Sequence, residues 1–179
     1  MILPIVLYGN DILRKKNKDV LLEEDFSILI NDMFETMYNA NGIGLAAPQI
    51  GKNINLFVAD IGSFGENEYN KKKIIAINPV LEFPKENEII EDIEGCLSIP
   101  NIGGNVRRYK TVKIKYYDEK KKYKEEEYHD WAARVIQHET DHLCQKLYID
   151  YLQANKDLTN ALEKIKKGEI VPTYDFTKR

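Results

Sequence analysis

The sequence predicts an α+β domain in which antiparallel β-sheets pack around a central HExxH helix, with a further helix near each end. Three observations support this fold class. Amphipathic helical segments lie early and late in the chain, several short strand-like segments follow one another between them, and one late helical segment carries two histidines four residues apart. Strands that succeed one another without intervening helices favour antiparallel sheets over regular βαβ units. At 179 residues we expect one domain over 1–179, with 170–179 as a flexible tail.

The composition, 43% hydrophobic and 31% charged, is that of an ordinary globular protein. A net charge of −3 argues against direct nucleic-acid binding. Two cysteines, Cys96 and Cys144, are fewer than a disulfide-stapled secreted domain usually has, so a reduced environment is expected. The apolar start lacks the basic leader of a signal peptide, and no apolar run has the length of a membrane helix. We therefore expect a cytoplasmic protein without membrane contact.

The first 20 residues read as extended chain with one helical turn over 11–14, which Asn10 can cap. The first long helix is predicted from about residue 26, with Asp25 or a neighbour as its cap, and it ends at Asn41-Gly42 in the left-handed conformation. Its apolar residues recur at helical spacing. These residues, expected in the core, are Phe26, Leu29, Ile30, Met33, Phe34 and Met37.

A glycine-rich segment, GIGLAAPQIG, starts at Gly42. Gly42, Gly44 and Ala47 match the dinucleotide-binding fingerprint, but that motif needs a strand before it and a helix opening after it. Here a helix precedes, and Pro48 interrupts any helix that follows. We interpret the segment as a tight loop where the backbone approaches another group closely, with the Gln49 amide available for a contact.

The middle of the chain contains strand-like segments. Val112, Ile114 and Tyr116 alternate with polar neighbours, as expected for a half-buried strand. A turn over 118–121 makes a hairpin, and its Lys and Glu runs read as a solvated edge that discourages aggregation. The predicted strands cover 55–61, 73–77, 80–83, 88–91, 111–117 and 123–128.

Two helices follow. The first is predicted over about 131–146, with Asp130 as its cap. The last is predicted over about 156–167 and ends at Gly168. Its inward residues are expected to be Leu158, Leu162 and Ile165.

The motif with most chemical information is QHETDH, which begins at Gln137. On a helix, His138 and His142 lie one turn apart on the same face, so both imidazoles can reach one ion. Glu139 then flanks the site and can handle protons, which is the hydrolytic HExxH arrangement. The alternatives are a purely structural metal or surface histidines on an ordinary helix. His129 reads as a surface histidine.

A catalytic site of this type has three protein ligands and an open position. From the residues alone, Cys96 is favoured and Glu163 is the alternative. Cys96 follows a glycine in a region of strands, whereas Glu163 lies in a lysine-rich helix where pairing with Lys167 would explain it. Cys144 turns away from the ligand face and reads as a small buried side chain.

The chain resembles the peptide deformylase family. Three motifs occur in the family's order: GIGLAAPQ at 42–49, EGCLS at 94–98 and QHETDH at 137–142. Smaller agreements are INP at 77–79 and YYD at 116–118, and the likeness extends from residue 2 to about residue 167. The segment after the second motif and the C-terminal helix are similar to the bacterial type I subgroup.

The resemblance implies a site. Its metal ligands would be Cys96, His138 and His142, which leaves Glu163 without that role. The catalytic residues would be Glu139, as general base and acid, with the Gln49 amide and the Leu97 N–H holding the oxyanion. The backbone at Ile43 and Gly44 would help to bind the peptide. Apolar candidates for the methionine pocket are Ile43 and Val135.

The resemblance also implies an activity: removal of the formyl group from the N-terminal formylmethionine of new polypeptides, with release of formate. Hydroxide on the ion would attack the formyl carbon. One divalent ion per chain is expected, Fe(II) first, with Zn(II), Ni(II) or Co(II) as substitutes. The partners would be nascent formyl-Met peptides, with transient ribosome contact. The location would be the bacterial cytoplasm, or an organelle only if a transit peptide is missing from this chain.

The chain departs from the family pattern in two places. Gln145 replaces a glycine soon after the third motif, and the stretch 101–104, expected to be a loop, lacks an arginine that some members carry there. Arg108 is expected to pair with Glu94 or Asp141, or to lie exposed. Two other functions stay open from the residues alone: a zinc endopeptidase with Glu163 as third ligand, and a non-enzymatic binding module. The intact base and amide speak against the second.

Overall fold

The computed structural model describes residues 1–62, 69 and 72–172. Most of the expected tail over 170–179 therefore lies outside the described residues. Over the described residues the fold is α+β, with two antiparallel sheets and three α-helices. Within the described part of the chain, no helix has both the length and the apolarity needed to cross a membrane.

The larger sheet has five strands in the order β1-β2-β3-β6-β7, and the smaller one is the β4–β5 hairpin. Every pairing between these strands is antiparallel. The strands are β1 (Gly44–Ala46), β2 (Leu56–Asp60), β3 (Lys73–Glu82), β4 (Ile89–Cys96), β5 (Ile99–Tyr109), β6 (Thr111–Tyr117) and β7 (Tyr123–His129).

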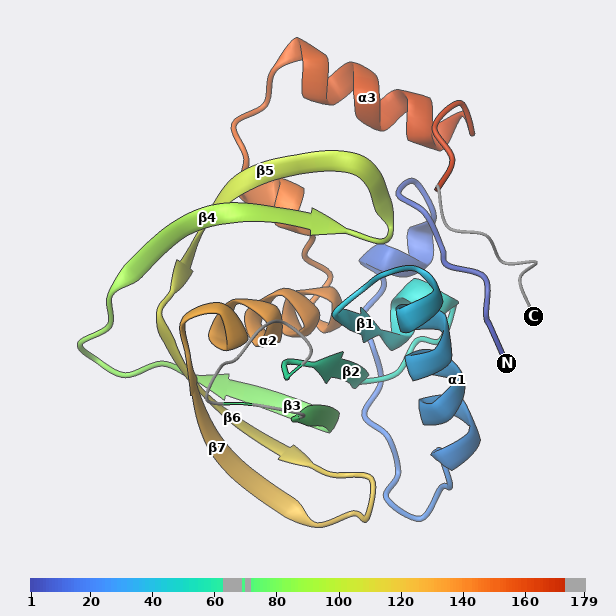
Figure 1. The fold of residues 1–179 in the computed structure, drawn as a ribbon. Coiled ribbons are helices and arrows are strands. Elements are labelled where there is room, and N and C mark those ends of the chain that lie inside the picture. Colours follow the sequence, from blue (N-terminus) through green and yellow to red (C-terminus); the bar gives the residue numbers. More distant parts are fainter. Residues whose placement is uncertain (63–68, 70–71, 173–179) are drawn as a thin grey trace.

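The three helices are α1 (Ser27–Asn39), α2 (Asp130–Leu143) and α3 (Lys156–Lys166). Helix α2 lies between the β4–β5 hairpin and the five-stranded sheet, and it contacts strands of both (Figure 1). Helix α1 packs on β1 and β2, whereas α3 packs on β5. Helix α2, which carries the two histidines, thus has strands of both sheets packed against it.

The core is built on both faces of β2, whose five residues are all buried. Phe57 and Ala59 belong to the cluster that α2 covers, while Leu56 and Val58 belong to the cluster that α1 covers. This is the period-2 alternation of a strand that is buried on both sides. A third cluster, which includes Tyr148, joins the hairpin to the end of the chain. Helix α2 thus covers one face of β2, and helix α1 covers the other.

Several predicted elements agree with the structure. The turn at 11–14 is a 3-10 helix, and the side chain of Asn10 accepts a hydrogen bond from the N–H of Ile12. Helix α3 has the predicted extent to within one residue, and Gly168 follows it with φ of 71°. Strand β6 has the predicted bounds. The predicted strands 73–77 and 80–83 are one strand with a β-bulge between Ile77 and Val80.

The prediction of a loop at 101–104 is wrong, because these residues belong to strand β5. It forms the return strand of the hairpin, with Gly103 and Gly104 opposite Gly95 and Glu94. Glycine is depleted in strands, so composition argued for a loop. A β-carbon at position 104 would overlap the side chain of Leu152, so glycine fits there and a larger residue does not. Strand β4 also extends five residues beyond the predicted end at 91.

The ends of α2 differ from the prediction as well. Asp130 does not cap the helix: His129 is the N-cap residue without a side-chain hydrogen bond, and Asp130 has φ of 51°. The helix ends at Leu143 instead of residue 146. Gln145 then adopts φ of 61°, a left-handed conformation that glycine takes at no steric cost. Cys144 caps the helix end and is exposed, so the prediction of a buried side chain is wrong.

Candidate metal centre

Cys96, His138 and His142 converge in space although two elements supply them. Cys96 ends β4 at an irregularity of the hairpin, and the histidines lie one turn apart on α2. One donor atom from each residue lies within 4.8 Å of the other two. The Sγ of Cys96 is 3.3 Å from Nε2 of His142, and the imidazole centroids are 5.1 Å apart.

This donor set suits a divalent metal ion. A thiolate and two imidazoles are ligands for Zn(II) and for other borderline transition metals. Three protein donors leave a position open, as in catalytic sites rather than closed structural sites. The three side chains are the only described His, Cys, Asp or Glu residues that form such a group. The donors present therefore fit a catalytic ion.

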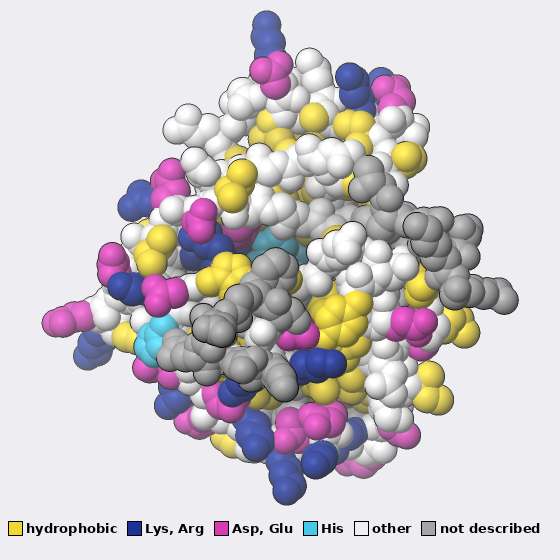
Figure 2. Space-filling model, in the orientation of Figure 1, with side chains coloured by type: hydrophobic (Ala, Val, Ile, Leu, Met, Phe, Trp, Pro, Cys, Tyr) yellow, Lys and Arg dark blue, Asp and Glu magenta, His cyan; other side chains and the backbone are white. Residues whose placement is uncertain are grey.

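A cavity of about 550 Å³ opens beside these residues. Histidine atoms lie recessed near the middle of the face in Figure 2. The cavity brings together most of the residues that the sequence singled out. The wall includes Ile43, Gly44, Gln49, Cys96, Leu97, Val135, His138 and Glu139.

Glu139 lies at this cavity and is 4% exposed. Its Oε2 has no hydrogen-bond partner among the described residues. Burial raises the pKa of Glu139 to about 7. The segment predicted as a tight loop is instead strand β1 followed by a 3-10 helix over Ala47–Ile50. A β-carbon at Gly44 in β1 would overlap the carboxyl group, so β1 and Glu139 lie in close contact. This is the close approach expected from the glycine-rich segment, and it places a carboxyl group that can hold or release a proton near neutral pH.

Gln49 lies in the 3-10 helix Ala47–Ile50 and is held in a defined orientation by the end of β1. Its Oε1 accepts a hydrogen bond of 2.8 Å from the N–H of Ala46. Its Nε2 therefore points the other way, 3.4 Å from Sγ of Cys96 and 3.2 Å from Oγ of Ser98. The side chain is 2% exposed. An amide donor thus lies at the edge of the three-residue cluster.

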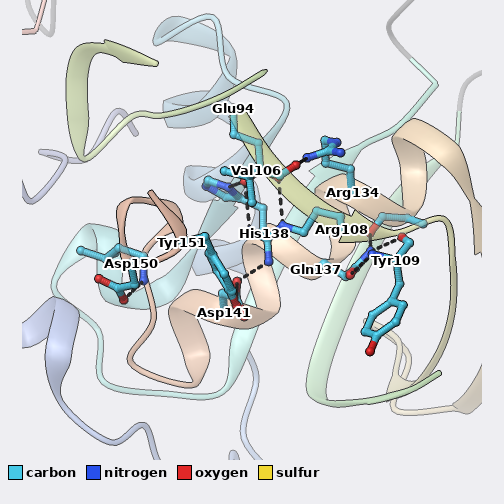
Figure 3. Close-up of polar contacts among 12 residues, drawn as sticks. Glu94, Val106, Arg108, Tyr109, Arg134, Gln137, His138, Asp141, Asp150 and Tyr151 are labelled. Carbon is cyan, nitrogen blue, oxygen red and sulfur yellow. Dashed lines mark hydrogen bonds and ion pairs between the residues drawn. The ribbon is translucent and has the colours of Figure 1, made fainter. Parts of the chain in front are cut away.

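Glu94 connects the hairpin to the first histidine (Figure 3). Its Oε2 lies 2.9 Å from Nδ1 of His138, and its Oε1 accepts hydrogen bonds from Arg108 and Arg134 at 2.9 and 2.7 Å. Arg108 also pairs with Asp141 at 2.5 Å. Both expected partners of Arg108 are therefore confirmed, and the alternative of an exposed arginine is wrong because this side chain is buried.

Charge explains the protonation of this network. Burial alone would raise the pKa of Glu94, but hydrogen bonds from His138 and Arg108 hold it well below its usual range. Burial also lowers the pKa of His142 well below 6.5, so this imidazole is neutral. For His138, contacts with Cys96 and Glu94 outweigh burial and raise the pKa well above 6.5. The ionised carboxylate of Glu94 therefore accepts a hydrogen bond from Nδ1–H of His138, whether the imidazole is neutral or charged.

Glu163 is not part of the cluster. It lies on α3, is about half exposed, and pairs with Lys166 at 2.7 Å instead of with the expected Lys167. The described group that could hold an ion contains Cys96 and not Glu163. The geometry therefore favours the thiolate as third donor over the carboxylate that an endopeptidase would use.

Among the residues of the site that sequence reasoning missed are Asp92 and Trp131, which line the cavity, and Arg134, which lines it and supports Glu94. The helical spacing contained a signal for Arg134, because it lies four residues before His138 on the same face of α2. Asp92 could have been placed at the site only if strand β4 had been predicted to its full length, Ile89–Cys96. No comparable signal pointed to Trp131.

The fold and the cluster together define a class: a metal-dependent hydrolase with an HExxH helix. The comparisons with known proteins identify the family. The model of the polypeptide deformylase family matches residues 2–157. The chain is 45% identical to the peptide deformylase of Karelsulcia muelleri over 152 residues, covering 84% of this chain and 78% of that one. It is 40% identical to that of Cytophaga hutchinsonii over 177 residues, covering 97% and 96%.

Solved structures agree. The peptide deformylase of Thermotoga maritima is 40% identical, with a TM-score of 0.75 over 86% of this chain and 99% of that one. The enzyme of Synechococcus elongatus in complex with actinonin is 35% identical, with a TM-score of 0.81 over 93% and 88%. The chain therefore belongs to the polypeptide deformylase family. It is an enzyme that removes the N-formyl group from newly made polypeptides.

Proposed function

We propose that this chain hydrolyses the formyl amide of formylmethionyl peptides with one divalent ion, Fe(II) in the cell, held by Cys96, His138 and His142. One observation carries the proposal: the three donors converge within 4.8 Å, and two of them, Cys96 and His138, line a cavity whose wall also includes the buried Glu139. Zn(II), Ni(II) or Co(II) would satisfy the same donors.

A bound ion would lower the pKa of a water molecule toward neutrality and polarise the formyl oxygen. Glu139 acts on the proton. Its pKa of about 7 lets the carboxylate accept a proton from the attacking water and the carboxylic acid return it to the departing amine nitrogen. The buried Oε2, which has no partner among the described residues, is the atom we assign to this transfer.

Gln49 and the N–H of Leu97 stabilise the oxyanion of the tetrahedral intermediate. The Nε2 of Gln49 is fixed beside Cys96 because the Oε1 of the same amide already accepts a hydrogen bond from the N–H of Ala46. A donor that is fixed before reaction loses little on reorganisation, and losing one costs about 3 kcal/mol of transition-state stabilisation. Leu97 lines the same cavity and follows Cys96 directly.

The peptide binds in an extended form beside β1, which is one of the two edge strands of the larger sheet. Ile43 and Gly44 present the backbone there, and the side chains of Ile43 and Val135 contact the methionine side chain at the cavity wall. Nascent formyl-Met peptides are the substrates. Transient contact with the ribosome, absence of nucleic-acid binding and a cytoplasmic location remain predictions.

The test measures formate release from a formyl-Met tripeptide by oxygen-free protein loaded with Fe(II) or Ni(II), with metal analysis on the same sample. Glu139→Ala should keep the fold and the ion while losing nearly all activity. Cys96→Ala should lose the ion, whereas Glu163→Ala should keep it. If the folded, fully metallated wild-type protein released no formate, the assignment would be wrong. If only Glu163→Ala lost the metal, Glu163 would be the third ligand, as in a zinc endopeptidase.

A further inference from the structure

A second cavity, of about 280 Å³, lies next to the cavity of the candidate metal centre. It is formed by the start of β4, the end of β5 and the first turn of α2. Three residues line both cavities: Asp92, Trp131 and Arg134. The two cavities therefore adjoin at these three residues, which we call the dividing wall.

The Arg134 part of this wall is rigid. Its guanidinium donates to Oε1 of Glu94, to the carbonyl oxygen of Val106 and to that of Ile90, at 2.7 to 2.8 Å. The side chain thus crosses from α2 to both strands of the hairpin (Figure 3). It is 7% exposed. Moving it would break three hydrogen bonds of a buried charge, which is costly.

The Trp131 part lies farther along the same helix face. Trp131 precedes Val135 by four residues and His138 by seven, spacings that place all three on one side of α2. At about 1.5 Å per residue, Val135 lies about 4.5 Å and Trp131 about 10.5 Å from His138 along the helix axis. A substrate side chain that runs from the ion along this face meets Val135 first and Trp131 at its far end.

We propose that Trp131 determines the longest N-terminal side chain that the enzyme accepts, and that the second cavity is an extension of the methionine pocket that the Trp131 side chain blocks. The inference rests on the proposed function. A small residue at position 131 joins the two cavities and admits a bulky aromatic side chain after the formyl group. Arg134 and Asp92 are unchanged in such a variant. The joined cavity would therefore extend from the position of the Trp131 side chain to Lys110 and Asp130, which line the second cavity.

The experiment compares kcat/KM for formyl-Met, formyl-Phe and formyl-naphthylalanyl tripeptides. In Trp131→Ala, the kcat/KM for the naphthylalanyl substrate divided by that for the Met substrate should rise at least about tenfold. A difference of one methylene group in a hydrophobic pocket already changes such a ratio by about that factor. Trp131→Phe should keep the wild-type ratio within about threefold. The control Tyr123→Ala also removes an aromatic ring, but from a half-exposed position on β7 outside both cavities, and should leave the ratio unchanged.

Trp131→Leu provides a second shortened variant if Trp131→Ala does not fold, as judged by circular dichroism and bound metal. An unchanged ratio in folded, metallated Trp131→Ala or Trp131→Leu would overturn the inference. An equal rise in Tyr123→Ala would overturn it as well. Turnover of formyl-Met by wild type in the same assay separates this outcome from a failure of the proposed function.

Discussion

Oε2 of Glu94 lies 2.9 Å from Nδ1 of His138, and this contact determines which nitrogen of the imidazole faces the cluster. Two guanidinium groups, of Arg108 and Arg134, keep the carboxylate ionised. An ionised carboxylate only accepts hydrogen bonds, so Nδ1 must carry the proton. The remaining nitrogen, Nε2, then points toward Cys96 and His142. A supporting carboxylate of this kind orients a metal-binding histidine and raises its basicity.

Glu94→Gln is therefore expected to weaken ion binding by about 10- to 100-fold, with a similar loss of activity at limiting metal. The amide can still reach His138, but it leaves the two buried guanidinium groups without that negative charge. The dissociation constant of the ion, measured by competition with a chelator, is the readout. Glu91→Gln removes an exposed carboxylate from the same strand and should bind the ion as wild type does. Equal affinity in both variants would contradict the orienting role.

Gly44→Ala should reduce kcat/KM by about 100-fold or more, within the range that general acid–base catalysis contributes. The added β-carbon would overlap the Glu139 carboxyl group, which would have to turn away from the cavity. The ion should stay bound, because the three donor side chains, Cys96, His138 and His142, are unchanged in this variant. Formate release and metal content are measured together. Gly103→Ala, where the nearest atom is 3.4 Å away, should stay within about threefold of wild type.

The sequence predicted most of the elements because their patterns are local. Helical spacing identified α1 and α3, and alternation identified β6 to the residue. Strand β5 was missed because its glycines are tolerated for a non-local reason, the contact of Gly104 with Leu152. The cap of α2 was missed because Asp130 has a left-handed backbone that hydrophobic periodicity does not reveal.

The candidate site shows the same division. The i, i+4 histidine pair follows from helix geometry, and the motifs that resemble the family pointed to Cys96 and Gln49. The supports of Glu94 could not be predicted in full, because Arg134 reaches it across 40 positions of sequence. The dividing wall between the cavities likewise depends on how β4 packs against α2, which composition and spacing do not determine.

Gln145→Gly is expected to stabilise the fold by about 0.5–1 kcal/mol. The residue has φ of 61°, and a side chain costs roughly 1–2 kcal/mol in the left-handed conformation, part of which the greater freedom of glycine in the unfolded chain offsets. The backbone carbonyl that accepts a hydrogen bond from Arg14 is kept. Thermal unfolding should shift upward by about 1–4 °C. Lys146→Gly, at a neighbouring exposed position without positive φ, should not be stabilised. A lower melting temperature for Gln145→Gly would show that its side chain matters more than its backbone.

Glu126→Gln is expected to remove part of the acid sensitivity of folding. The Oε2 of Glu126 accepts hydrogen bonds from the hydroxyls of Tyr116 and Tyr128 at 2.5 and 2.7 Å, and Oε1 pairs with Lys72 at 2.9 Å. Burial alone would raise the pKa of Glu126, but these contacts lower it below the usual 4.5. The folded state therefore binds this proton less readily than the unfolded state does. Its stabilisation is fully present above about pH 5 and is lost as the pH falls through the folded pKa.

Urea unfolding of the metal-free protein between pH 7 and pH 3 measures this effect without titration of an ion. At pH 7, Glu126→Gln should be less stable than wild type by about 2 kcal/mol, the contribution of hydrogen bonds to a charged group. The difference should shrink as the pH falls, because wild type loses the carboxylate and the variant has none to lose. Glu119→Gln, at an exposed turn position, should follow the wild-type curve. A constant difference between Glu126→Gln and wild type across this range would mean that shape rather than charge explains the contribution of Glu126.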